Sequence, residues 1–299
     1  MLTKKISQTD FSFDTNTVGD TASIKSTFDK YGLVVLNNAL NNSLSISNSM
    51  LLQKSIITIA ADMCNKLGLP ILQNEDPIVM LDNAVKILEE KDRKALGQVQ
   101  GLVSQSLAMA TYSVNPDISN FVSLLLGVES KSFIMESFGG FVPNIPSNTS
   151  RLYTYHSEQH WLPYRKNFIN VWGALFRSKN INEGTMWVKP FSHLDQHEFC
   201  EYRGYSGVSD QESYMQYEVI DNDLYQELGL KVEPTDLVLF HQNLLHKSEV
   251  NLSNKVGYLY INRFFDVRKD LTISSIMGIR PYSSQSENIG RQIRFFKNK

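Results

Sequence analysis

Asp236-Leu-Val-Leu-Phe-His-Gln-Asn-Leu-Leu-His246 begins with a short apolar run of the kind that forms a buried β-strand. Several such segments follow Gly139-Gly140, and they are rich in Tyr, Val, Phe and Trp and separated by Pro, Asn, Ser and Gly. Because no helical pattern comes between them, they predict an antiparallel sandwich or barrel rather than a parallel α/β sheet. The segments are 151–156, 168–177, 184–189, 215–220, 236–241 and 256–265.

The first half of the chain has a helical pattern instead. Residues 22–31 predict a short helix that stops at Gly32, and an apolar strand follows at 33–36. From about 43 to 127 apolar residues recur at helical spacing, with Asn115-Pro116-Asp117 as the predicted start of the last helix and Gly127 as its end. The fold class expected is therefore α+β, with a mainly β core that is wrapped by N-terminal helices.

We expect one domain over residues 1–299, because there is no internal repeat and no linker that would separate the β half. Its parts are a polar N-terminal segment, a mostly helical part, a β core and a C-terminal extension. Their ranges are 1–21, 43–130, 140–266 and 267–299.

The composition excludes several classes of protein. Hydrophobic residues make up 42% of the chain and charged residues 20%, which is typical of a folded globular protein. The net charge is −2, from 29 basic and 31 acidic residues, and the basic residues form no run that could follow a phosphate backbone. We therefore expect a small-molecule substrate and no nucleic-acid partner.

The cysteines and the apolar runs indicate where in the cell the protein is located. Cys64 and Cys200 lie far apart without a CxxC pattern, so neither a disulfide framework nor a thiolate zinc site is predicted. Residues 1–20 lack the apolar core of a secretory signal, and no apolar run approaches the ~18 residues of a membrane span. These features predict a cytoplasmic protein that does not enter a membrane.

All six histidines lie after residue 155, in the β half. Any one of them is more often hydrogen-bonded or exposed than a metal ligand. His156 and Glu158 differ, because they stand two residues apart at the end of the predicted strand 151–155 and so project to the same side. His246 ends another apolar segment and supplies a third ligand. Two imidazoles and one carboxylate on one face of an iron ion leave three positions open, as in non-haem iron(II) oxygenases.

A second pair of residues could supply the metal ligands instead of His156 and Glu158. His193-Leu194-Asp195 is also a His-x-Asp sequence, but it follows a predicted turn and continues as polar surface. His241 is five residues before His246, so a loop must intervene if both are to bind one ion, and His197 lies in a polar segment. We interpret His241 and His197 as structural and keep His193 with Asp195 as the alternative ligand pair.

Several segments together resemble the phytanoyl-CoA dioxygenase superfamily of iron(II)/2-oxoglutarate oxygenases. The similarity covers roughly residues 22–266, although 43–130 match poorly, and it assigns His193 to a turn in which Phe191 replaces the family's glycine. The segments that carry it are 28–36, 156–165, 169–175, 184–193, 236–241 and 246–251.

This resemblance implies a double-stranded β-helix, that is, a jelly-roll or cupin-like barrel. It also implies that His156, Glu158 and His246 bind Fe(II), with 2-oxoglutarate as co-substrate and O2 as oxidant. The family usually has aspartate at position 158; the extra methylene of glutamate shifts the metal by about 1 Å but keeps an anionic oxygen ligand. A small neutral residue there would suggest a halogenase, so Glu158 favours hydroxylation or another oxidation.

The resemblance further implies that Trp172 and Ser248 help line the 2-oxoglutarate pocket. The family's arginine for the far carboxylate stands eleven residues after the distal histidine, and here that position is Gly257. On a strand, Lys255 and Arg263 would share a face with Gly257, and positions two apart are separated by about 6.6 Å, which a lysine side chain can largely cover. Lys255 is the first candidate for this anchor and Arg263 the second.

The function expected is hydroxylation of an unactivated C–H bond of a small molecule, with release of succinate and CO2. His160, Trp161 and Arg165 follow the first ligands and are candidates for substrate contacts, Arg165 through a carboxylate or phosphate, although Trp161 fits a core aromatic equally well. Residues 43–130 and 198–214 would be natural lids. The alternative is a cupin-like metal protein that is not an oxygenase, an isomerase or a binding module, and the glycine at position 257 supports it.

Overall fold

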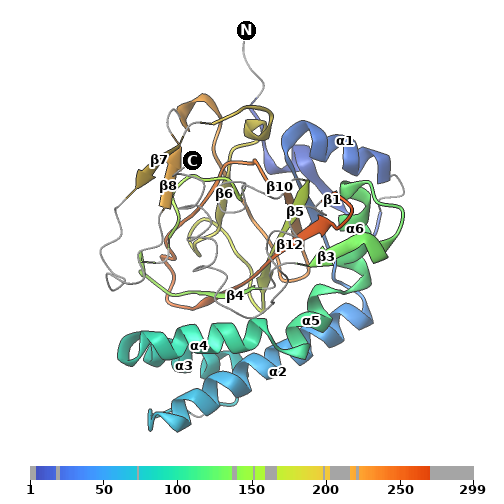
Figure 1. The fold of residues 1–299 in the computed structure, drawn as a ribbon. Helices are drawn as coiled ribbons and strands as arrows, with labels where there is room; N and C mark the ends of the chain where they lie inside the picture. The colour runs from blue at the N-terminus through green and yellow to red at the C-terminus, as the bar shows by residue number, and fades with distance from the viewer. Residues whose placement is uncertain are drawn as a thin grey trace, which may run out of the picture.

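Two facing β-sheets and a layer of helices form most of the computed structural model (Figure 1). The structure describes residues 5–17, 21–72, 74–136, 140–150, 152–158, 167–197, 199–202, 216–219 and 222–269. The chain therefore has a mixed α+β fold with a β-sheet core, as the sequence predicts. Among the described residues, no helix combines the length and the hydrophobicity that crossing a membrane requires.

The larger sheet has seven strands, and neighbours pair antiparallel except for β1 with β2. Its order is β1-β2-β10-β5-β12-β3, and β4 also pairs with β12. The bounds are β1 (Ser12–Asp14), β2 (Leu33–Asn37), β3 (Ile134–Glu136), β4 (Gly140–Asn144), β5 (Phe168–Leu175), β10 (Leu237–His241) and β12 (Gly257–Asp266).

The smaller sheet has the order β11-β6-β9, and its inner side chains pack against those of the larger sheet. Its strands are β11 (His246–Ser248), β6 (Met186–Val188) and β9 (Leu228–Gly229), while β7 (Phe199–Tyr202) and β8 (Gln216–Val219) pair with each other in a separate two-stranded sheet. Because side chains of both sheets belong to one buried cluster, the sheets face each other. We call this cluster the inter-sheet core; it includes Leu33, Val35, Trp172, Ala174, Met186, Val188, Leu230, Val232, Val238, Phe240, Leu244 and Leu259.

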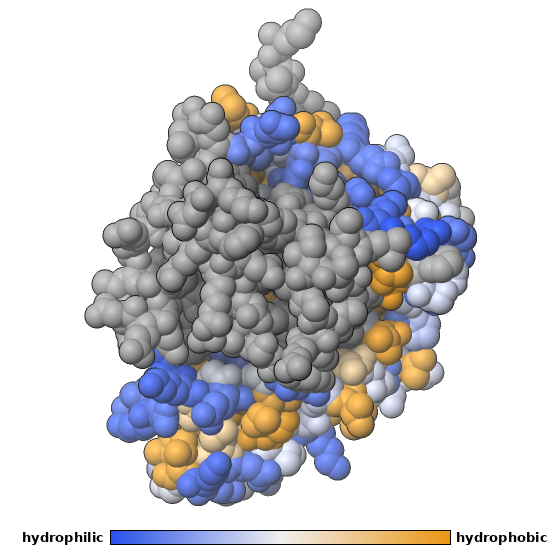
Figure 2. Space-filling model, viewed as in Figure 1, coloured by the Kyte–Doolittle hydropathy of each residue, from blue (hydrophilic) through white to orange (hydrophobic). Residues whose placement is uncertain are grey.

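Helices cover the opposite face of the larger sheet. Alternate residues of the same strands, such as Val171, Leu239 and Tyr258, pack into a second buried cluster with the helices. Figure 2 shows apolar and hydrophilic residues intermixed over this helical layer, at the bottom of the view. The helices are α1 (Thr21–Tyr31), α2 (Ser43–Lys66), α3 (Pro77–Lys91), α4 (Arg93–Ser104), α5 (Leu107–Ser113) and α6 (Pro116–Leu126), with 3-10 turns η1 (Gln8–Phe11), η2 (Lys131–Phe133), η3 (Ser192–Leu194) and η4 (Asn222–Leu224).

The predicted helical half is confirmed in detail. Asn115 caps the start of α6 by accepting a hydrogen bond from the Asp117 N–H, and Gly127 ends it with φ 67°. The predicted strand 151–155 is wrong, because among its described residues, 152–155, none is in a strand and only the next residue, His156, forms an isolated bridge. The predicted lid 43–130 lies on the face of the larger sheet that is turned away from the inter-sheet core.

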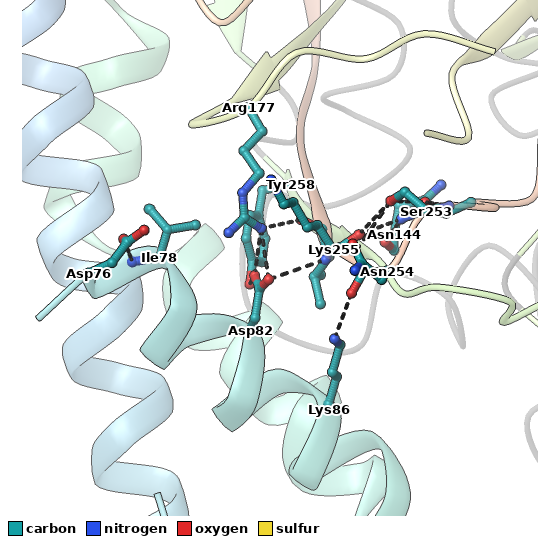
Figure 3. Close-up of polar contacts among 12 residues, drawn as sticks. Asp76, Ile78, Asp82, Lys86, Asn144, Arg177, Ser253, Asn254, Lys255 and Tyr258 are labelled. Carbon is teal, nitrogen blue, oxygen red and sulfur yellow. Dashed lines mark hydrogen bonds and ion pairs between the residues drawn. The ribbon is translucent and has the colours of Figure 1, made fainter. Parts of the chain in front are cut away.

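A partly buried ion pair joins α3 to the larger sheet (Figure 3). The carboxylate of Asp82 accepts hydrogen bonds from Arg177 Nη1 at 2.7 and 2.9 Å and from the Tyr258 hydroxyl at 2.8 Å. Arg177 Nη1 also donates to the Val256 carbonyl at 2.9 Å, just before β12. One carboxylate thus fixes the helix, the segment after β5 and the start of β12.

Replacing Asp82 with alanine is expected to lower the free energy of unfolding by about 2–3 kcal/mol, because it removes the carboxylate that accepts hydrogen bonds from Arg177 and Tyr258. Chemical denaturation of the variant and the wild type measures the difference in the free energy of unfolding. The control is Lys86→Ala on the same helix, whose exposed amine donates to the Asn254 carbonyl at 2.9 Å (Figure 3). It should change stability by less than about 0.5 kcal/mol, and equal losses in the two variants would refute the special role of Asp82.

Candidate metal centre

Three buried side chains, His156, Glu158 and His246, meet at one point beside the smaller sheet. Each offers one ligand atom, and these atoms all lie within 4.8 Å of one another. Nε2 of His246 is 3.5 Å and Nε2 of His156 is 3.9 Å from Oε1 of Glu158. Within the described ranges, no other set of three or more His, Cys, Asp or Glu side chains has this spacing. The structure therefore brings together the three residues that the sequence predicts as metal ligands.

Backbone pairing places the two imidazoles side by side. The N–H of His156 donates to the His246 carbonyl and the N–H of His246 to the His156 carbonyl, both at 3.0 Å. His246 is also the first residue of β11 and lies opposite Val188 of β6. Side chains of directly paired residues lie on one face of a sheet, and the centroids of the two rings are 4.3 Å apart.

Hydrogen bonds to the backbone orient both rings. Nδ1 of His156 is 2.7 Å from the Thr154 carbonyl, and Nδ1 of His246 is 3.0 Å from the Leu244 carbonyl. A carbonyl only accepts, so each Nδ1 carries the proton, and Nε2 of the neutral ring keeps its lone pair for a metal. Burial, together with the neighbouring His246, lowers the pKa of His156 to about 3, which keeps this ring neutral.

Arg263 of β12 holds the third side chain in place. Its Nε donates to Oε2 of Glu158 at 2.8 Å, and its Nη2 donates to the same oxygen. Burial raises the pKa of Glu158 whereas the Arg263 guanidinium lowers it, and the pKa lies well below its ordinary value. The carboxylate is ionised, with Oε2 bound to Arg263 and Oε1 facing the imidazoles.

This donor set fits a divalent first-row transition metal. Two imidazole nitrogens and one anionic oxygen lie within 4.8 Å of one another, and a metal held by only three protein ligands has further coordination positions for other ligands. The Nδ1–H bonds and the arginine on Glu158 supply the outer hydrogen bonds that orient metal ligands in proteins.

The four residues predicted to bind 2-oxoglutarate lie in different parts of the structure. Trp172 belongs to the inter-sheet core, and Ser248 follows His246 by two residues, opposite Met186. Lys255 is exposed in the turn before β12, where its carbonyl accepts a hydrogen bond from Asn251 Nδ2 at 2.8 Å (Figure 3). Arg263 faces the inter-sheet side as expected, but the carboxylate that it binds is that of Glu158.

The histidines considered as alternative metal ligands lie in or next to the turn around η3. Nε2 of His193 donates to the Asp29 carbonyl at 3.0 Å, and its ring lies 5.3 Å from the ring of His241. Nε2 of His197 lies 2.6 Å from the Ser192 carbonyl, and Asp195 accepts a hydrogen bond from the Tyr225 hydroxyl. The structure thus places neither His193 nor Asp195 in the cluster of three.

Phe191, which stands where the resembled turn has glycine, has φ 70°. This is the left-handed conformation that glycine adopts most readily. Its ring lies 4.9 Å from the ring of Tyr31, so packing against α1 accompanies the unusual backbone. The turn therefore keeps the shape that a glycine would give it.

Three predicted substrate contacts, His160, Trp161 and Arg165, lie outside the described residues. Sequence reasoning missed the contact of Arg263 with Glu158 and the buried position of Lys179. Lys179 lies in a polar segment after β5, which reads as a solvated turn, and only its backbone pairing with Val232 reveals that it is buried.

Comparisons with known proteins show which family the chain belongs to. The family model described as phytanoyl-CoA dioxygenase (PhyH) matches residues 85–256, more than half of the chain. A probable phytanoyl-CoA dioxygenase of Caenorhabditis elegans is 27% identical over 204 residues, which are 64% of this chain and 60% of that protein. The match thus spans less than two thirds of the length of this curated relative.

Solved structures share the fold. EctD from S. alaskensis, in its apo form, has a TM-score of 0.54 at 16% identity, over 87% of this chain and 82% of that one. SnoK, a non-heme alpha ketoglutarate dependent carbocyclase from nogalamycin biosynthesis, has a TM-score of 0.52 at 16% identity, over 92% and 97%. EctD has also been crystallised with bound Fe and with 2-oxoglutarate and 5-hydroxyectoine. At such low identity the likeness concerns the fold alone.

Proposed function

Since this chain belongs to the phytanoyl-CoA dioxygenase family, we propose that it is a non-haem iron(II)- and 2-oxoglutarate-dependent dioxygenase. The reaction proposed is hydroxylation of an unactivated C–H bond of a small molecule, with release of succinate and CO2. The observation that carries it is the buried cluster in which ligand atoms of His156, Glu158 and His246 lie within 4.8 Å of one another. In this proposal the two facing sheets form a double-stranded β-helix around the site.

The protein would hold Fe(II) through Nε2 of His156, Nε2 of His246 and Oε1 of Glu158. When bound, the ferrous ion supplies O2 activation coupled to the decarboxylation of 2-oxoglutarate. One carboxylate against a doubly charged cation leaves a net positive site, which attracts the dianion 2-oxoglutarate.

The chain's own residues hold and shield this site. The Thr154 and Leu244 carbonyls fix the imidazole rings, and Arg263 fixes Glu158 so that Oε1 stays directed at them. The apolar inter-sheet core, to which Trp172 contributes, would exclude water from the co-substrate. Ser248, two residues along β11 from His246, would lie beside it.

Substrate contacts are proposed for His160, Trp161 and Arg165, since these residues follow the first two ligands in the sequence. A guanidinium at position 165 would suit a substrate that carries a carboxylate or phosphate. The relatives named above act on different molecules, so this part of the proposal rests on the sequence of this chain alone.

Succinate formation tests the proposed reaction. Protein purified without oxygen is loaded with Fe(II), supplied with 2-oxoglutarate and exposed to O2, and succinate is measured against a matched reaction kept anaerobic. We expect oxygen-dependent succinate even without the natural substrate, through uncoupled turnover. Firm metal binding without 2-oxoglutarate affinity or succinate would contradict the proposal and favour a cupin-like protein that is not an oxygenase.

A further inference from the structure

We propose that the ammonium group of Lys179 binds the distal carboxylate of 2-oxoglutarate and thereby positions the co-substrate. This inference rests on the proposed function. The residue that binds this carboxylate would then be a lysine between β5 and β6. The candidates predicted from the sequence for the same role are Lys255 and Arg263.

Lys179 is fully buried, which is rare for lysine. Its backbone pairs with Val232, a residue of the inter-sheet core, through hydrogen bonds of 2.8 and 2.9 Å. Its side chain runs alongside Gly257, where a Cβ atom would lie 2.0 Å from Nζ and 2.6 Å from Cε of the lysine. The ammonium therefore occupies the space into which a side chain at position 257 would project.

That space lies on the inner side of the larger sheet. Along β12, Tyr258 and Tyr260 pack with the helices, whereas Leu259 and Ile261 pack with the inter-sheet core. Side chains alternate along a strand, so position 257 faces the same side as Leu259. Lys179 thus brings a cation to the inner side at one end of β12.

The metal centre lies toward the other end of the same strand. Arg263, on the same face of β12 six positions after Gly257, reaches Glu158 of the cluster. The co-substrate has a keto acid at one end and a second carboxylate at the other. With its keto acid at the metal, the distal carboxylate would point between the sheets, where an apolar core would leave it unpaired unless a cation were present.

The ammonium of Lys179 has capacity for such a partner. A lysine offers three N–H donors, and the acceptor found for it in the described part of the chain is the carbonyl of Glu183. Burial lowers its pKa to about 8, against the opposing effect of Glu183, so at neutral pH most of it is still charged. A buried charge with few partners gains most from an arriving anion.

The two earlier candidates are placed less well. Lys255 is exposed in the turn before β12, and Arg263 already binds Glu158. A purely structural role remains the competing explanation for Lys179, because its bond to the Glu183 carbonyl would also fasten the turn that precedes β6. The following experiment separates the two roles.

Affinities for 2-oxoglutarate and for 2-oxopentanoate, which has the same carbon chain without the distal carboxylate, are measured by anaerobic calorimetry. The proteins are the Fe(II)-loaded wild type, Lys179→Met and the control Lys255→Met. Lys179→Met should bind 2-oxoglutarate about 10- to 100-fold more weakly than wild type, as expected for one lost charged hydrogen bond. Its affinity for 2-oxopentanoate should stay within about twofold, and Lys255→Met should match wild type for both ligands.

A double variant moves the positive charge from position 179 to position 257 and should restore binding of 2-oxoglutarate. In Lys179→Ala/Gly257→Arg, the arginine enters the space that the lysine has left, and 2-oxoglutarate affinity should recover relative to Lys179→Ala. Methionine at 179 removes a buried charge without shortening the chain, so folding should persist. Should that variant not fold, Gly257→Ala tests the same point, because its methyl group displaces the ammonium and should weaken 2-oxoglutarate binding selectively.

Results that differ from these expectations would overturn the assignment of Lys179 or the proposed function. Equal losses for both ligands would show a structural role and overturn the assignment, as would unchanged 2-oxoglutarate affinity in Lys179→Met or a loss in Lys255→Met. Wild-type protein that binds Fe(II) but not 2-oxoglutarate would overturn the proposed function as well. Failure of the assignment alone is thus distinguishable from failure of the function.

Discussion

His246→Ala is expected to weaken Fe(II) binding by more than about 100-fold and to abolish oxygen-dependent succinate formation. Removing an outer hydrogen-bond partner of a metal ligand typically costs about 10- to 100-fold in affinity, so removing the ligand itself should cost more. Nε2 of this residue lies 3.5 Å from Glu158 Oε1, and no other histidine of the described segments reaches the cluster. Anaerobic titration of Fe(II) against a competing chelator measures the loss.

The matched control is His241→Ala, which removes an imidazole five residues earlier. That ring lies against His193 and Phe28, at centroid distances of 5.3 and 6.2 Å, and takes no part in the cluster. It should keep wild-type Fe(II) affinity. The ligand assignment fails if the control loses iron as His246→Ala does, or if His246→Ala binds iron normally.

The metal-free protein is expected to lose stability steeply as the pH falls below about 6.5. Burial lowers the pKa of His156 to about 3 and that of His241 to about 4. Below the ordinary value of 6.5 the unfolded chain therefore binds protons that the folded chain does not. Stability is fully present above pH 6.5 and falls by about 1.4 kcal/mol per pH unit for each ring.

Denaturant unfolding between about pH 6.5 and 5 isolates this effect, because ordinary carboxylates titrate lower. His241→Asn should reduce the slope by about 1.4 kcal/mol per pH unit, since one titrating ring is removed. A slope near zero in the wild type would mean that both rings are protonated in the folded protein, and an unchanged slope in the variant would mean that the His241 ring is.

Much of the fold could be predicted because the deciding signals are local. Asn115, Pro116 and Gly127 mark the two ends of α6, and capping depends only on residues within one turn of the helix end. The strands β9 and β11, of two and three residues, were not predicted as strands, because an alternating pattern cannot be recognised over so few positions.

The three residues predicted as metal ligands do come together in the structure, but for a reason that was partly wrong. His156 and Glu158 were placed at the end of a strand over 151–155, whereas only His156 pairs, through one bridge to His246. The two-residue spacing suffices to bring both side chains to one place. The long-range bridge that brings His246 beside His156 leaves no local trace in the sequence.

The long basic side chains could not be placed from sequence. Alternation put Arg263 on the inner face of β12, but which carboxylate it binds depends on the position of Glu158, far away in the chain. Lys179 is buried because its backbone pairs with Val232 and because Gly257 leaves room for its side chain. Neither condition can be read from the residues that surround Lys179.

Anomalous diffraction at the iron absorption edge, from a crystal grown anaerobically with Fe(II), tests the central claim most directly. The account predicts one strong peak at about 2.0–2.2 Å from Nε2 of His156, Nε2 of His246 and a carboxylate oxygen of Glu158, the usual range for such ligands to a divalent metal. A peak bound elsewhere, for example at His193, or one that omits any of the three ligands, would contradict it.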